Sequence, residues 1–252
     1  MKRIVTFVFF AAVMLTLSVN VGAATLSLLP GPTAGTPASG SISSANNAFL
    51  GPGGLLSLPA IAGYFGSTVN YSVAGPGGSV TIDFFGGEAG FNDQLLYNSG
   101  AGFVVPPGFG HSGVPVTLIA PSLLSPLATF TAALTGSGTL PFEFMVNGAV
   151  GGTTGGPVNG LNPLNAPGLP PNFFAACAPL SSAGPTPTVC GDTVWLFLDD
   201  NGRSDDDDYD DYAVRITVSD GSRIVLTPEP GSLVLLSSAL LGLGLAWRKL
   251  SR

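Results

Sequence analysis

The chain has 252 residues, including 36 Gly and 22 Pro, and only 9% of its residues are charged. Gly and Pro are the poorest helix formers and dominate turns, so this composition favours short β-strands joined by many turns. Between Thr25 and Thr227 there are three basic residues, all Arg, against fourteen acids. Because nucleic-acid binding needs a basic face, this balance excludes a nucleic-acid partner and makes cations the natural ones.

Residues 1–24 have the layout of a secretory signal peptide. They combine a basic start, an apolar stretch from Ile4, and small residues at Ala23 and Ala24, where cleavage is expected. We therefore predict a signal helix that directs export, with an uncleaved signal anchor as the alternative.

The body of the chain is predicted to be all-β. Residues 25–60 are rich in Gly, Pro and Ser and are expected to be a flexible lead-in. Residues 61–227 contain runs with two-residue alternation between turn residues, the pattern of half-buried strands. These runs cover residues 68–73, 79–85, 114–120, 127–134, 140–146, 193–198, 212–218 and 223–227. We expect a β-sandwich-like domain with long Gly/Pro-rich loops, in which the last three runs form a meander.

Residues 151–190 have few strand signals and are expected to be a long surface excursion. Near the end of this segment lie Cys177 and Cys190, the only two cysteines of the chain. Export would place them in an oxidising compartment, so we predict a disulfide between them. Metal binding by two isolated thiols is the weaker alternative.

The connection between residues 193–198 and 212–218 reads "DDNGRSDDDDYDD", with eight carboxylates in thirteen residues. A hard cation would relieve the repulsion between them. Calcium accepts six to eight oxygens from irregular loops, and magnesium, which needs stricter geometry, is the second choice. The spacing is not that of an EF-hand, and the alternative is a solvated acidic loop. The candidate ligands are Asp199, Asn201, Asp205, Asp207, Asp208 and Asp210.

The C-terminus contains a second membrane-directed segment, within the region 228–252. Residues 233–247 carry no charge, which predicts a short transmembrane helix. The basic residues that follow would stay on the cytoplasmic side of the inner membrane. The elements of this tail are Pro228, Glu229 and Pro230, then the apolar helix, then Arg248, Lys249 and Arg252.

This order of Pro-Glu-Pro, apolar helix and basic tail resembles the PEP-CTERM sorting signal of exported proteins of Gram-negative bacteria. The resemblance implies that an exosortase, a membrane protease-transpeptidase, recognises the Pro-Glu-Pro element and removes the helix. The protein would then pass from the inner membrane to the cell surface or the extracellular polysaccharide matrix. An ordinary uncleaved anchor is the alternative.

Two further segments resemble parts of PEP-CTERM proteins. "WLFLDDNGRSDDDDYDDYAVRITV" is similar to an Asp-rich hairpin near the end of such proteins, and "VTIDFFGGEAGFNDQLLY" is similar to another recurrent segment. The second similarity implies that Glu88 and Asn92 lie on a loop that presents polar atoms, with Asp93 beside them. For Glu88 we favour a structural role in that loop.

No catalytic constellation stands out in the sequence. His111 is the only histidine, it lies in a Gly/Pro-rich stretch, and no G-x-S-x-G element accompanies it. We therefore expect a structural or adhesion protein of the cell surface or exopolysaccharide matrix, stabilised by calcium, and not an enzyme. Its expected partners are the exosortase and extracellular polysaccharide. The alternative is a secreted enzyme that acts on that polysaccharide.

Overall fold

The computed structural model describes residues 23–30, 38–45, 47–75, 77–88, 90–111, 118–151, 155–164, 170–182, 188–201 and 208–220. All of them belong to one compact unit, Gly22–Gly221. Every regular element in these ranges is a β-strand, which confirms the predicted all-β class. The described residues include no helix long and apolar enough to cross a bilayer.

Fifteen strands make up the described part of the chain. In chain order they are β1 (Thr25–Pro30), β2 (Ala38–Ser43), β3 (Ala60–Phe65), β4 (Ser67–Ser72), β5 (Gly78–Gly87), β6 (Asp93–Asn98), β7 (Phe103–Val104), β8 (Gly110–His111), β9 (Leu118–Ile119), β10 (Ala128–Leu134), β11 (Ser137–Thr139), β12 (Phe142–Val146), β13 (Asn172–Cys177), β14 (Thr193–Asp199) and β15 (Tyr212–Ser219).

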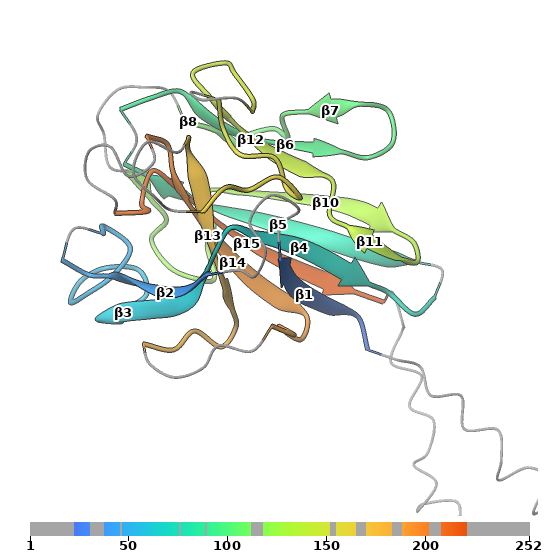
Figure 1. Ribbon diagram of the computed structural model, residues 1–252, viewed down its shortest axis with the longest axis horizontal. Coiled ribbons are helices and arrows are strands. Elements are labelled where there is room, and N and C mark those ends of the chain that lie inside the picture. The colour runs from blue at the N-terminus through green and yellow to red at the C-terminus, as the bar shows by residue number, and fades with distance from the viewer. Residues whose placement is uncertain are drawn as a thin grey trace, which may run out of the picture. The chain divides into compact units, whose positions relative to one another are not determined.

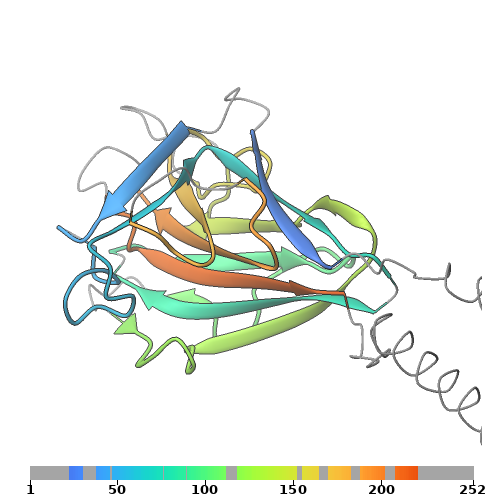
Figure 2. The same ribbon diagram turned by 90° about the horizontal axis from the view of Figure 1, so that it is seen from below.

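The strands form three antiparallel sheets. The largest runs β10-β5-β15-β14-β13-β3-β2, with β9 also paired to β5. The second runs β1-β4-β11, and the third runs β12-β6-β7 with β8 paired to β6. In Figure 1 the third sheet lies at the top, β2 and β3 lie at the lower left, and the central strands of the largest sheet lie between them. Figure 2 shows β15 and β5 side by side along much of their length, in agreement with their register.

The largest sheet is apolar on both faces because alternate side chains enter two different cores. One face contributes residues such as Phe84, Leu196 and Val214 to a core shared with strands of the other two sheets. The opposite face contributes Phe85, Trp195 and Phe197 to a second core, which is closed by residues 49–50 and 55–58. Because both faces of the sheet bury apolar area, β13 and β14 can be apolar along nearly their whole length.

Residues 25–60 were expected to be a lead-in without strands, and this expectation is wrong, because β1 and β2 lie within them. In β1 the alternating Leu26 and Leu28 are fully buried in the first core. In β2 only Ile42 is buried, and this Ser/Gly-rich strand forms because its backbone pairs with β3 along its whole length. The described strands therefore begin at Thr25 rather than near residue 61.

The expected surface excursion over residues 151–190 is also corrected by the structure. Its segment Asn172–Cys177 is β13, an interior strand that pairs with β14 on one side and β3 on the other. All six of its residues are buried. A strand buried on both faces has no polar alternation, so the two-residue pattern that revealed the other strands was absent here.

The predicted meander holds for its first two strands only. β14 pairs with β15, but the other edge of β15 is occupied by β5 over Ser79–Gly86. The third expected strand, residues 223–227, lies outside the described residues. Of the expected strand at residues 114–120, the described portion contains only β9.

Candidate functional site

The acidic connection lies between β14 and β15, and the structure describes its two ends. Asp199, Asn201, Asp208 and Asp210 are among the described residues, whereas Asp205 and Asp207 are not. The backbone N–H of Asp200 donates to Oδ2 of Asp211 at 2.8 Å, which ties the two ends together. Asp199 and Asp208 both lie close enough to Asp211 for their charges to raise its pKa. The described candidate ligands therefore gather around the base of one hairpin.

Two tyrosines anchor the second end of this connection in the two cores. Tyr209, which has a positive φ of 62°, enters the second core and donates its hydroxyl to Oδ1 of Asn172 at 2.7 Å. Tyr212 enters the first core and donates its hydroxyl to the carbonyl oxygen of Phe109 at 2.6 Å. In the sequence "DYDDY", the two buried tyrosines thus hold the acidic residues between them against the two cores.

Asp210 has a structural partner of its own. Its Oδ2 accepts the backbone N–H of Ala48 at 2.5 Å, and Nδ2 of Asn47 donates to the carbonyl oxygen of Asp208 at 2.6 Å. Residues 47–48 therefore close over this end of the hairpin. This contact was not predicted, because it joins segments about 160 residues apart.

The end of β5 lies directly against the hairpin. The N–H of Glu88 donates to the carbonyl oxygen of Asp210 at 2.9 Å. A Cβ atom on Gly87 would lie 1.8 Å from the carbonyl oxygen of Asp211, so only glycine fits there. Gly86 has a φ of 116° beside a register shift in the pairing with β15. The two glycines of "FFGGEAGF" therefore permit the close approach. The segment that contains β5 and the acidic connection therefore meet at this point.

Asp93 is the residue that sequence reasoning left out of the ligand set. It is the first residue of β6, in the third sheet, and it is fully buried. Its carboxyl lies within hydrogen-bonding reach of that of Asp200 and close to the charge of Asp211. Neither of its carboxylate oxygens accepts a hydrogen bond from a donor in the described residues. The sequence placed Asp93 beside Glu88 and Asn92 but gave no sign that its carboxyl is buried near the acidic connection.

Glu88 and Asn92 occupy the rim of the same region. Glu88 is exposed, and its charge contributes to the raised pKa of Asp210. The N–H of Asn92 donates to Oδ1 of Asn147 at 3.2 Å, and the N–H of Asn147 donates back to the carbonyl oxygen of Asn92 at 3.0 Å. These backbone contacts fix the loop that leads into Asp93.

Burial raises the pKa of three carboxyls in this cluster. The pKa of Asp93 is raised to about 7 by burial and by the charge of Asp211. The pKa of Asp210 is raised to about 8, first by burial and then by neighbouring carboxylates, against the opposing effect of the Ala48 N–H. Burial followed by the charge of Asp200 raises the pKa of Asp211 to about 9. Ionised carboxyls in this cluster therefore need a positive partner.

The described residues offer no Lys or Arg as that partner. Arg215 is the only basic residue among them besides His111, whose side chain is outside the description. The Nη2 of Arg215 lies 2.7 Å from Oδ2 of Asp83, and its guanidinium also lies over the rings of Phe85 and Trp195. Arg203, in the acidic connection itself, lies outside the described residues.

The described carboxyls fit a cation only with some movement. No three His, Cys, Asp or Glu side chains in the described part of the chain already surround one point as metal ligands. Calcium tolerates irregular oxygen sets and takes carbonyl, amide and water oxygens as well as carboxylates. A site here would combine the clustered carboxylates with such oxygens.

A second concave surface lies over the outer face of the largest sheet. It is lined by Leu56, Leu58, Leu123, Ala178, Pro179, Leu180, Thr193, Trp195, Arg215 and Thr217. Its one charged lining residue is Arg215, which is already bound to Asp83. This surface therefore offers no free charged group to orient a ligand.

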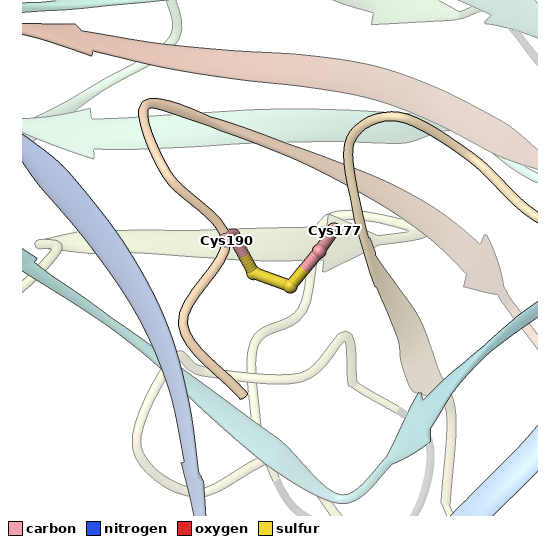
Figure 3. The surroundings of a disulfide bond; sticks show 2 residues. All are labelled: Cys177 and Cys190. Atoms are coloured by element: carbon pink, nitrogen blue, oxygen red, sulfur yellow. A yellow bond between two sulfur atoms is a disulfide. The ribbon is translucent and has the colours of Figure 1, made fainter. Parts of the chain in front are cut away.

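The predicted disulfide is present. Cys177, at the end of β13, is bonded to Cys190, and their Cα atoms are 4.5 Å apart (Figure 3). Both cysteines are buried in the first core. The N–H of Cys190 donates to the carbonyl oxygen of Leu26 at 2.8 Å, so the bond also holds the segment that lines β1.

The predicted sorting residues are outside the described part of the chain. This applies to Pro228, Glu229 and Pro230, to Arg248, Lys249 and Arg252, and to the signal peptide up to residue 22. Ala24 is described and is buried next to β1. No protein-family model matches the chain, and no match was found among curated proteins or among solved structures.

Proposed function

We propose that this chain is an exported structural or adhesion protein of the cell surface or exopolysaccharide matrix. In this proposal an exosortase-type protease sorts the chain through its PEP-CTERM signal, and a β-sandwich-like domain carries the function outside the cell. The domain is calcium-stabilised, and extracellular polysaccharide is its partner. The C-terminal helix serves as an inner-membrane intermediate during export.

The positions of the described strands support the proposed export. The first described strand begins at Thr25, directly after the predicted signal peptide, and the last described strand ends at Ser219. Removal of residues 1–24 and of the residues from 228 onward would therefore leave all fifteen described strands intact. The Cys177–Cys190 disulfide is also typical of proteins that mature in an oxidising compartment.

The burial of the acidic cluster is the observation that supports the proposed binding of calcium. Asp199 is 1% exposed, Asp200 is 6% exposed and Asp210 is 1% exposed, so these groups are not a solvated acidic face. Burying several carboxylates together is costly unless protons or a cation neutralise them. Outside the cell, calcium is the hard cation that suits irregular oxygen donors.

Thermal unfolding of the full chain tests the proposed binding of calcium. Calcium at a hundredfold excess over its dissociation constant would stabilise the folded state by about 2.7 kcal/mol. For a domain of this size, that corresponds to a rise in melting temperature of roughly 5–11 °C over the protein in chelator. Magnesium at the same concentration should give a smaller rise. A melting temperature that is the same in calcium and in chelator would refute calcium stabilisation.

A further inference from the structure

Asp93 has a buried carboxyl with no hydrogen-bond donor for either oxygen among the described residues. The residue is 0% exposed. It belongs to β6, whereas the two carboxyls that interact with it, Asp200 and Asp211, lie directly after β14 and directly before β15. A buried carboxyl therefore faces two others across the boundary between two sheets.

The neighbouring polar groups do not compensate Asp93. The hydroxyl of Tyr212 lies close by, but it donates to the carbonyl oxygen of Phe109. Oδ2 of Asp211 is engaged by the N–H of Asp200. The two carboxyls within reach of each other, Asp93 and Asp200, share no proton when both are ionised. A positive ion bound here compensates the buried carboxyl of Asp93, whose two oxygens have no other partner in the described residues.

We propose that Asp93, Asp200 and Asp211 supply the inner ligands of the calcium site, so that the bound ion fastens the sheet of β6 to the sheet of β14 and β15. This inference rests on the proposed calcium stabilisation and specifies where the ion binds. Because no three carboxyls in the described residues already surround one point, binding draws these three together at the buried base of the hairpin, and the remaining ligands are amide, carbonyl or water oxygens. The site thereby unites the Gly-Glu-Ala-Gly-Phe-Asn-Asp segment with the acidic hairpin.

If Asp93 is an inner ligand, Asp93→Asn should affect the melting temperature differently in calcium and in chelator. Asp93→Asn keeps the size of the side chain but removes its charge. In chelator, the variant should melt at or above the temperature of the wild type, because the uncompensated buried charge is gone. In calcium, the variant should lose the rise in melting temperature that the wild type shows.

The test measures melting temperatures of the full chain in chelator and in calcium chloride for the wild type, Asp93→Asn, Asp200→Asn and the control Asp192→Asn. Asp192 is an exposed acid outside the cluster, so its variant should respond to calcium as the wild type does. Asp200→Asn should lose the response as Asp93→Asn does, and it decides the matter if Asp93→Asn does not fold.

The outcomes separate this inference from the broader proposal. A wild type that does not respond to calcium overturns both. A wild-type response retained in full by Asp93→Asn and Asp200→Asn overturns only the inner site and leaves calcium on the outer hairpin. If Asp93→Asn melts well below the wild type in chelator, Asp93 has a purely structural role, and the inner site is likewise overturned.

Discussion

Replacing Gly87 with Ala should destabilise the protein strongly. The added Cβ atom would lie 1.8 Å from the carbonyl oxygen of Asp211, about 1.6 Å short of the 3.4 Å at which ordinary contact begins. The obstacle is backbone, which cannot rotate away as a side chain can. The end of β5 must therefore separate from the hairpin base, with loss of the hydrogen bond from the Glu88 N–H to the Asp210 carbonyl oxygen.

The expected cost is about 3 kcal/mol, the upper part of the usual range for overpacking. It corresponds to a fall in melting temperature of roughly 6–12 °C for a domain of this size. Urea unfolding followed by tryptophan fluorescence measures the free energy directly, because Trp195 is buried in the second core. Gly90→Ala is the matched control: Gly90 lies just beyond the end of β5, and its Cβ would meet nothing within 4 Å. Equal stability of the Gly87→Ala and Gly90→Ala variants would show that β5 does not approach the hairpin as described.

Three further predictions concern the disulfide, a buried tyrosine hydroxyl and a buried carboxyl. Replacing both Cys177 and Cys190 with Ala should lower the free energy of unfolding by about 3 kcal/mol, because the closed loop of thirteen residues no longer restrains the unfolded chain. Urea unfolding measures this change, and an unchanged unfolding midpoint would contradict the prediction. Tyr212→Phe removes the hydroxyl that donates to the buried carbonyl oxygen of Phe109, and it should lower the free energy of unfolding by about 1–3 kcal/mol. Tyr71→Phe, which removes an exposed hydroxyl, should lower it less in the same assay. Equal losses of unfolding free energy in the two variants would contradict the difference in burial. Burial raises the pKa of Glu143 above its usual value. This group therefore stabilises the folded state below about pH 4.5, and the contribution is lost as the pH rises through the folded-state pKa. Glu143→Gln should raise the melting temperature at pH 7 more than at pH 4, and a change that does not depend on pH would contradict this prediction.

The strands that the sequence predicted correctly are those with one polar and one apolar face, or with a strong apolar run beside a turn. β4, β5, β10 and β12 are of this kind. β13 escaped prediction because its six residues are buried on both faces, and β2 escaped because Ser and Gly carry no strand signal of their own. In both strands the pairing with neighbours decides the conformation, and pairing partners are not visible in a single sequence.

Only those residues of the candidate site that are close together in the sequence could be predicted. The density of aspartates between β14 and β15 pointed to a charged hairpin, and Asp199, Asn201, Asp208 and Asp210 indeed lie at its base. The participation of Asp93 and of residues 47–48 depends on contacts between segments more than 100 residues apart. A single aspartate at the start of a strand is typical of a turn, so the local sequence around Asp93 did not indicate a buried carboxyl.

The mass of the mature protein's C-terminus, measured separately in the cell envelope and in the medium, is the most direct test of the proposed export and sorting. We expect a terminus near residues 228–230, with residues 233–252 absent, on protein found at the cell surface or in the matrix. Protein that ends at Arg252 and remains in the membrane fraction would contradict sorting by an exosortase and make the chain a tethered membrane protein.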